Sequence, residues 1–174
     1  MISNPSLRKA KVDGMSYEKR FELFCNSKNV GSIYHSRWSK SGTGSFDEDN
    51  KILVKDFPYE SIYPGSICKT EFVLILNDRR IRIEFKSQEK AGSVDEKIPY
   101  LLENVRYKFP EYEVILAILG DGWRPGIKEY IATQKFRHKK VSIFYDYDEL
   151  EGYVNDIISK SKIQKLFKYR STIY

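Results

Sequence analysis

Residues 70–88 constrain the fold more than any other stretch, because they have the pattern of two strands joined by a polar turn at 77–80. One face of the second strand is apolar and consists of Ile81, Ile83 and Phe85. Successive side chains of a strand point to opposite faces, so the residues between them share the other face. That second face is charged or polar and consists of Arg82, Glu84, Lys86 and Gln88. The pattern predicts a β-hairpin with one apolar face and reactive groups on the other.

The open end of this hairpin gathers groups that suit phosphate chemistry. If the strands pair about the turn, Glu71 of the first strand lies near Glu84, Lys86 and Gln88 of the second. Two carboxylates, an ammonium group and an amide fit a hard divalent cation with a phosphate above it. An isolated Glu-x-Lys triplet is more often a solvated ion pair, which contributes only about 0.2–1 kcal/mol. Glu71, Gln88 and the stretch that follows them favour the cation site.

The same residues resemble a known signature. Glu71, the triplet Glu84-Phe85-Lys86 and Gln88 are similar to the motif of the PD-(D/E)XK nucleases, the restriction-endonuclease-like superfamily. Residues 92–99 resemble a stretch that follows this motif in many restriction-type members, where it opens the helix behind the active site. The resemblance covers roughly residues 16–123.

This resemblance implies a metal site on the hairpin. Glu71, Glu84 and the backbone carbonyl of Phe85 would hold one or two Mg²⁺ ions, which Mn²⁺ could replace. In the family an early helix often adds a glutamate, and here Glu18 or Glu22 could take that place.

The first acidic ligand departs from the family pattern. In the family it is usually an Asp that follows a Pro, whereas Glu71 has no adjacent Pro. Either Glu71 takes this place or the ligand lies elsewhere, for example at Asp56 or Asp78.

The resemblance also implies an activity, namely Mg²⁺-dependent hydrolysis of duplex DNA of the kind that a type II restriction endonuclease carries out. Lys86 would orient or deprotonate the attacking water and stabilise negative charge, and as a base it would need a lowered pKa. Gln88 would contact a phosphate oxygen or position Lys86.

The rest of the chain alternates helices and strands. Helices are expected over 16–28, 93–108, 125–137 and 147–159. Further strands are expected over 51–57, 113–119 and 141–145, with a shorter strand-like piece at 32–36. This order predicts an α/β fold, a central mixed β-sheet flanked by helices, which agrees with the restriction-endonuclease-like core that the resemblance implies.

Individual residues predict where several of these helices and strands begin or end. The apolar run at 113–119 is typical of a fully buried, parallel strand. Pro58 is expected to end the strand before it, and Pro99 predicts a kink or break in the helix around it. Ser93 and Glu96 have the spacing of a capping box at a helix start.

Length and composition predict one domain over residues 1–174, with a loose basic arm at 1–14 and a basic tail at 160–174. The hydrophobic fraction of 41% is ordinary for a globular protein, and the net charge of +6 mildly favours a polyanionic partner. Two distant cysteines, Cys25 and Cys68, read as buried free thiols. With no signal-like or membrane-spanning run, we expect a cytoplasmic protein that does not enter membranes.

The expected partner is double-stranded DNA. Candidate contacts are polar or basic residues outside the hairpin core: Arg37, Lys40, Lys90, Ser93, Lys97, Arg137 and Lys139. The basic stretch at 79–82 is a further candidate for phosphate contacts. Cutting both strands of a palindrome needs two sites related by a two-fold axis, so a homodimer is expected.

Two other functions fit the same sequence. A junction-resolving or repair nuclease would share the fold and the site but act on a different DNA structure. A non-catalytic DNA-binding module would keep the charge pattern as surface and show no dependence on Mg²⁺.

Overall fold

The computed structural model describes residues 15–40, 51–77 and 79–171, with side chains described as far as Ser161. Its helices are α2 (Tyr17–Ser27), α3 (His35–Trp38), the 3₁₀ helix η1 (Val94–Lys97), α4 (Ile98–Tyr107), α5 (Ile127–Ala132) and α6 (Tyr147–Ser171). Its strands are β1 (Gly31–Tyr34), β2 (Lys51–Glu60), β3 (Ile67–Leu76), β4 (Arg79–Ser87), β5 (Glu113–Leu119) and β6 (Lys140–Phe144).

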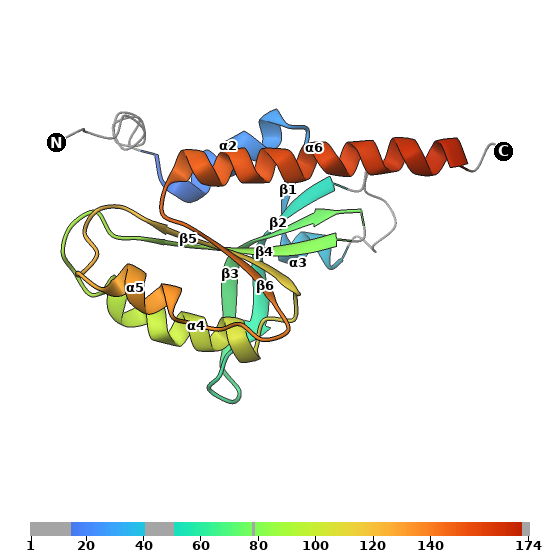
Figure 1. Cartoon of the computed structure of the whole chain (residues 1–174). Helices are drawn as coiled ribbons and strands as arrows, with labels where there is room; N and C mark the ends of the chain where they lie inside the picture. The colour runs from blue at the N-terminus through green and yellow to red at the C-terminus, as the bar shows by residue number, and fades with distance from the viewer. Residues whose placement is uncertain (1–14, 41–50, 78, 172–174) are drawn as a thin grey trace.

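Within these residues the six strands form one sheet in the order β1-β2-β3-β4-β5-β6. The pairs β2–β3 and β3–β4 are antiparallel, whereas β1–β2, β4–β5 and β5–β6 are parallel. Helices α2 and α6 lie on one face, and α4 and α5 lie on the other (Figure 1). The predicted α/β fold, a central mixed sheet flanked by helices, is therefore confirmed.

Each face of the sheet has its own hydrophobic core. Ile81, Ile83 and Phe85 pack with residues of α2 and α6, as the alternation of β4 predicts. The opposite core joins even-numbered residues of β5 to α4. Strand β5 is buried along nearly its whole length and parallel to β4, which confirms the prediction for residues 113–119.

Two strand boundaries differ from expectation. Strand β2 does not end at Pro58 but continues to Glu60, opposite Ile67. Strand β1 accompanies β2 only as far as Lys55, so at Pro58 β2 is an edge strand, where a residue without an N–H group is tolerated. The hairpin turn is also shorter than predicted, because Arg79 already pairs with Leu76 in the ladder.

The helix around Pro99 starts in two steps. The 3₁₀ turn Val94–Lys97 precedes α4, and Pro99 lies in the first turn of α4, where no backbone donor is needed. The predicted break is confirmed, but the capping box is wrong. The Ser93 side chain makes no capping hydrogen bond, and the Glu96 amide donates to the Ser93 backbone carbonyl at 3.2 Å.

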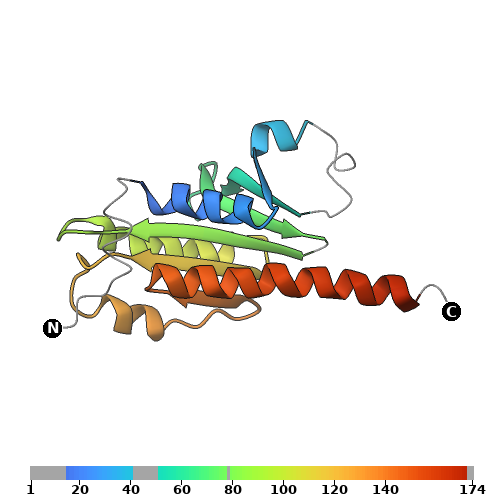
Figure 2. The ribbon, with the colours of Figure 1, turned by 90° about the horizontal axis from the view of Figure 1, so that it is seen from above.

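The last two helices differ in length from the prediction. Helix α5 begins after Gly126, whose φ of 86° is left-handed, and Thr133 closes it by donating from Oγ1 to the Tyr130 carbonyl. Helix α6 continues to Ser171, because no Pro or Gly interrupts residues 153–171. Seen from above, α2 and α6 lie over the same face and α6 extends past the sheet (Figure 2). Much of the predicted tail from residue 160 is thus helical.

Several predictions fall where the structure gives no description, namely the arm at 1–14, Asp78 and the side chains from residue 162 onward. Both cysteines are free thiols, Cys25 buried and Cys68 partly exposed. Burial raises the pKa of the Cys25 thiol. Among the described helices, none is both long and apolar enough for a membrane crossing.

Candidate active site

The candidate site lies where β3 separates from β4. Pairing of the two strands runs from Leu76 opposite Arg79 to Phe72 opposite Ile83. Beyond Phe72 and the unpaired Glu71, β3 pairs with β2 from Thr70 to Ile67. Backbone groups of β4 past Ile83 therefore need other partners on this side, since unpaired buried amides and carbonyls are costly.

Two side chains of β3 supply those partners. The Phe85 amide donates to Glu71 Oε2 at 3.2 Å. The Thr70 hydroxyl lies 3.1 Å from the Ile83 carbonyl oxygen and also contacts a carboxylate oxygen of Glu84. The divergence of the strands thus turns Thr70 and Glu71 toward β4 and gathers the polar groups of the site.

Lys86 is the centre of this group. Its Nζ atom donates to Glu84 Oε1 at 2.7 Å, to the Phe85 carbonyl at 2.9 Å and to Glu71 Oε1 at 3.5 Å. Glu84 is buried, whereas Glu71 and Lys86 are partly buried. Three oxygen atoms therefore converge on one cationic nitrogen at a site that still reaches solvent.

The charged groups of the site shift one another's pKa values. Burial, reinforced by the nearby Glu84 carboxylate, raises the pKa of Glu71 to about 8. Burial alone would lower the pKa of Lys86, but the Glu84 and Glu71 carboxylates outweigh it and leave that pKa raised. A lysine base would need a lowered pKa, whereas the two carboxylates favour the ammonium form of Lys86.

The oxygen atoms around Lys86 Nζ suit a hard divalent cation. Carboxylate and carbonyl oxygens are the ligands that Mg²⁺ prefers, and Glu71, Glu84 and Phe85 supply three of them. A bound cation would favour the ionised form of Glu71, whose pKa is raised, and the two carboxylates would then carry more negative charge than Lys86 neutralises. The chemistry of this donor set therefore fits the metal that the sequence led us to expect.

The described part of the chain does not add a third acidic ligand. No group of three or more His, Cys, Asp or Glu side chains in it is placed to hold a metal. Glu22, one of the two helical candidates, instead accepts from Ser32 at 2.7 Å, from Lys55 at 2.9 Å and from Lys19 at 3.1 Å. Neither Glu18 nor Asp56 belongs to such a group either.

Gln88 joins three segments and does not face a free phosphate position. Its Nε2 donates to the Gly122 carbonyl at 2.7 Å, and its Oε1 accepts from the Val94 amide at 2.8 Å. The Gly122 amide in turn donates to the Gln88 carbonyl at 2.7 Å. Gln88 is buried, and its amide fastens the end of β4 to the loop after β5 and to η1.

Most of the predicted DNA contacts are exposed: Arg37, Lys40, Lys90, Ser93, Lys97 and Arg137. Lys139 is used within the fold, where its ammonium group donates to the carbonyls of Phe109 and Glu111 and burial lowers its pKa. Arg82 of the basic stretch is fully buried and paired with Glu111, so it cannot contact a phosphate.

Thr70 is the residue of the site that the sequence did not indicate. Its position directly before Glu71 and its small hydroxyl side chain were the available signals. They were insufficient because in a regular ladder Thr70 and Glu71 would point to opposite faces.

Comparison with known proteins adds one match. A family model described as a PD-(D/E)XK nuclease superfamily domain matches residues 10–157. Neither curated proteins nor solved structures gave a match. The matched range includes the whole sheet and the Lys86 cluster, which consists of Thr70, Glu71, Glu84, Phe85 and Lys86.

Proposed function

Since the chain belongs to the PD-(D/E)XK nuclease superfamily, we propose that it is a Mg²⁺-dependent endonuclease that hydrolyses phosphodiester bonds in duplex DNA, as a type II restriction enzyme does. The convergence of Glu71, Glu84 and the Phe85 carbonyl on Lys86 Nζ carries this proposal. It is an oxygen-rich cation site beside a lysine.

The chain's own residues have separate roles in this proposal. Glu71, Glu84 and the Phe85 carbonyl would hold Mg²⁺, or Mn²⁺ in its place. A bound divalent cation supplies Lewis-acid polarisation of the phosphate and lowers the pKa of a coordinated water. Thr70 holds the Glu84 carboxylate in place, as a hydrogen-bonded neighbour of a ligand does.

Lys86 acts through its charge in this account. As an ammonium ion beside the cation site, it would stabilise the negative charge that develops on the phosphate oxygens. Gln88 contributes indirectly, by fixing the segment from Glu89 to Val94 that directly follows the catalytic strand.

The proposal also covers the oligomeric state of the protein and its location in the cell. A homodimer would place two sites about a two-fold axis and cut both strands of a palindromic duplex. A cytoplasmic location would bring the enzyme to DNA.

Cleavage assays test the proposal and its alternatives together. The chain is incubated with supercoiled plasmid, linear duplex, single-stranded DNA and a four-way junction, with Mg²⁺ or with EDTA. We expect Mg²⁺-dependent cleavage of duplex DNA. Cleavage confined to the junction would instead indicate a resolving nuclease, and no cleavage of any substrate would indicate a binding module.

Substitution of Lys86 makes the assay specific to the site. We expect Lys86→Ala to lower the cleavage rate by about 100-fold or more, the usual effect of removing a charge-stabilising group, while duplex binding persists. Lys128→Ala removes an exposed lysine of α5 and serves as the control. Normal plasmid nicking by Lys86→Ala would contradict the proposal.

A further inference from the structure

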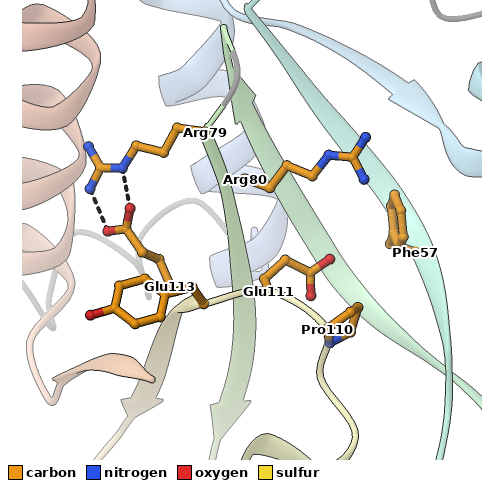
Figure 3. A pocket seen from close by; sticks show the side chains of 7 residues that line it. Phe57, Arg79, Arg80, Pro110, Glu111 and Glu113 are labelled. Atoms are coloured by element: carbon orange, nitrogen blue, oxygen red, sulfur yellow. Dashed lines mark hydrogen bonds and ion pairs between the residues drawn. The ribbon is translucent and has the colours of Figure 1, made fainter. Parts of the chain in front are cut away.

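A pocket outside the candidate active site lies at the opposite end of β4. It has a volume of about 370 Å³, and its lining includes Phe57, Arg79, Arg80, Glu111, Tyr112 and Glu113 (Figure 3). Arg80 and Lys86 are six positions apart on one strand, which corresponds to about 20 Å. A ligand in this pocket would therefore not touch the Lys86 cluster.

The two carboxylates of the pocket are already neutralised. Glu113 is held by Arg79 and lies 3.3 Å from Lys140, and the Arg79 hydrogen bond is the main reason that its pKa is lowered. Glu111 accepts from Arg82 Nη2 at 3.0 Å. Neither carboxylate is left to repel an anion.

Arg80 is the cation of the pocket that stays available. It is exposed, and within the described residues its guanidinium forms no hydrogen bond or ion pair. Its side chain extends toward Phe57 (Figure 3), and its guanidinium carbon lies 5.8 Å from the centre of the Trp38 ring, a contact that leaves its N–H donors unused. The guanidinium carbon of Arg82 lies 5.3 Å from the Phe57 ring, and its buried Nη1 has no hydrogen-bond partner in the described residues. The pocket thus has a positive charge excess.

Aromatic rings lie beside this positive charge. The Phe57 ring is fixed by ring contacts with His35 at 4.7 Å and Trp38 at 5.7 Å. Tyr112 is 63% exposed beside the same cavity. A free guanidinium pairs well with phosphate, and aromatic faces are surfaces on which bases stack.

We propose that this pocket binds a nucleotide, with its phosphate at Arg80 and its base against Phe57. The volume suits a ligand of this size. The nucleotide belongs to a strand of the DNA bound for cleavage, and in this respect the inference rests on the proposed function. A free nucleotide has the same chemistry, so the experiment must separate the two sources.

Equilibrium dialysis of the full chain with radiolabelled dTMP, in EDTA, tests the pocket directly. We expect Arg80→Gln to weaken dTMP binding at least tenfold and Lys128→Gln, a matched loss of one exposed charge, to leave it unchanged. Phe57→Leu, which keeps an apolar side chain but removes the aromatic face, should weaken dTMP binding but not the binding of inorganic phosphate. Absence of dTMP binding to the unsubstituted chain, or equal binding by Arg80→Gln, would overturn the proposal.

A second titration with a 16-base-pair duplex in EDTA identifies the source. If Arg80→Gln weakens both dTMP and duplex binding, the ligand is a nucleotide of the bound strand. If it weakens dTMP binding alone, the pocket takes a free nucleotide. Both titrations omit divalent cations and measure no cleavage, so a chain that binds dTMP but cuts no DNA would refute the nuclease proposal alone.

Discussion

Thr70 is buried where β3 leaves β4, and its hydroxyl contacts both Glu84 and the Ile83 carbonyl. Thr70→Val keeps the shape of the side chain but leaves those oxygens without this donor. We expect cleavage at limiting Mg²⁺ to fall about 10- to 100-fold, the usual effect of losing a hydrogen bond to a metal ligand. Thr70→Ser keeps the hydroxyl and should retain most of the rate. Initial rates measured against Mg²⁺ concentration check this, and an unchanged half-saturation point in Thr70→Val would contradict it.

Single residues show how far sequence reasoning reaches. The common face of Glu84 and Lys86 follows from the two-residue period of a strand, so it was predictable. The role of Gln88 was not, because its partners Gly122 and Val94 come from other segments. Arg82 was read as a surface charge because Glu111, which neutralises it in the interior, lies 29 positions further along the chain.

At the scale of elements, Glu22 joins α2 to β1 and β2. Burial alone would raise its pKa, but hydrogen bonds from Lys55, Ser32 and Lys19 outweigh burial and lower the pKa to about 2. Because the folded pKa lies below the unfolded value, this carboxylate stabilises the fold fully above about pH 4.5. That stabilisation is lost as the pH falls toward 2.

Glu22→Gln should therefore reduce stability in a pH-dependent way. We expect a loss of about 1–3 kcal/mol at pH 7, typical of hydrogen bonds to a charged group, and a shrinking difference from pH 4.5 to pH 3. Urea unfolding followed by circular dichroism measures both. Glu18→Gln, one turn earlier on the same helix, is the control, and a difference that stays constant with pH would contradict the assignment.

The contact between the end of β4 and the loop after β5 leaves no room for a side chain at Gly122. A Cβ atom there would lie 2.4 Å from the backbone carbon of Lys90. We expect Gly122→Ala to cost about 1–3 kcal/mol through overpacking and to lower cleavage by displacing the segment after Lys86. Gly152→Ala in α6 meets nothing within 4 Å and should stabilise the helix slightly. Thermal unfolding of both variants checks this, and equal melting temperatures would refute it.

Elements differed in how well the sequence determined them. Strand β5 was predicted at its observed bounds, because a continuous apolar run between Pro110 and Gly120 has few other solutions. The ends of α5 and α6 were not predicted correctly, because helices of the same composition can stop at several positions. The extension of β2 past Pro58 depends on where β1 stops, which no local pattern encodes.

For the whole molecule, the mixed character of the sheet followed from a hairpin joined through a helix to a buried strand. The parallel pairing of β1 with β2 and the shared face of α2 and α6 did not, because both arise from packing between distant segments. Figure 2 shows the two helices over one face, and Arg20 of α2 bonds Asp148 of α6 at 2.9 Å.

The net charge of +6 leads to a prediction at this scale. Phosphate contacts release counterions, so binding of a duplex should weaken at least about tenfold between 50 and 200 mM salt. Fluorescence anisotropy with a labelled duplex in EDTA measures this. Affinity that does not change with salt would show that the basic surface does not contact the DNA backbone.

Binding of Mn²⁺ measured by electron paramagnetic resonance tests the central claim most directly, since it needs no substrate and no cleavage. The account predicts that the unsubstituted chain takes up Mn²⁺ and that Glu71→Gln and Glu84→Gln each weaken uptake at least tenfold, while Glu18→Gln does not. Mn²⁺ binding of equal strength in all four proteins would contradict the placement of the cation between β3 and β4.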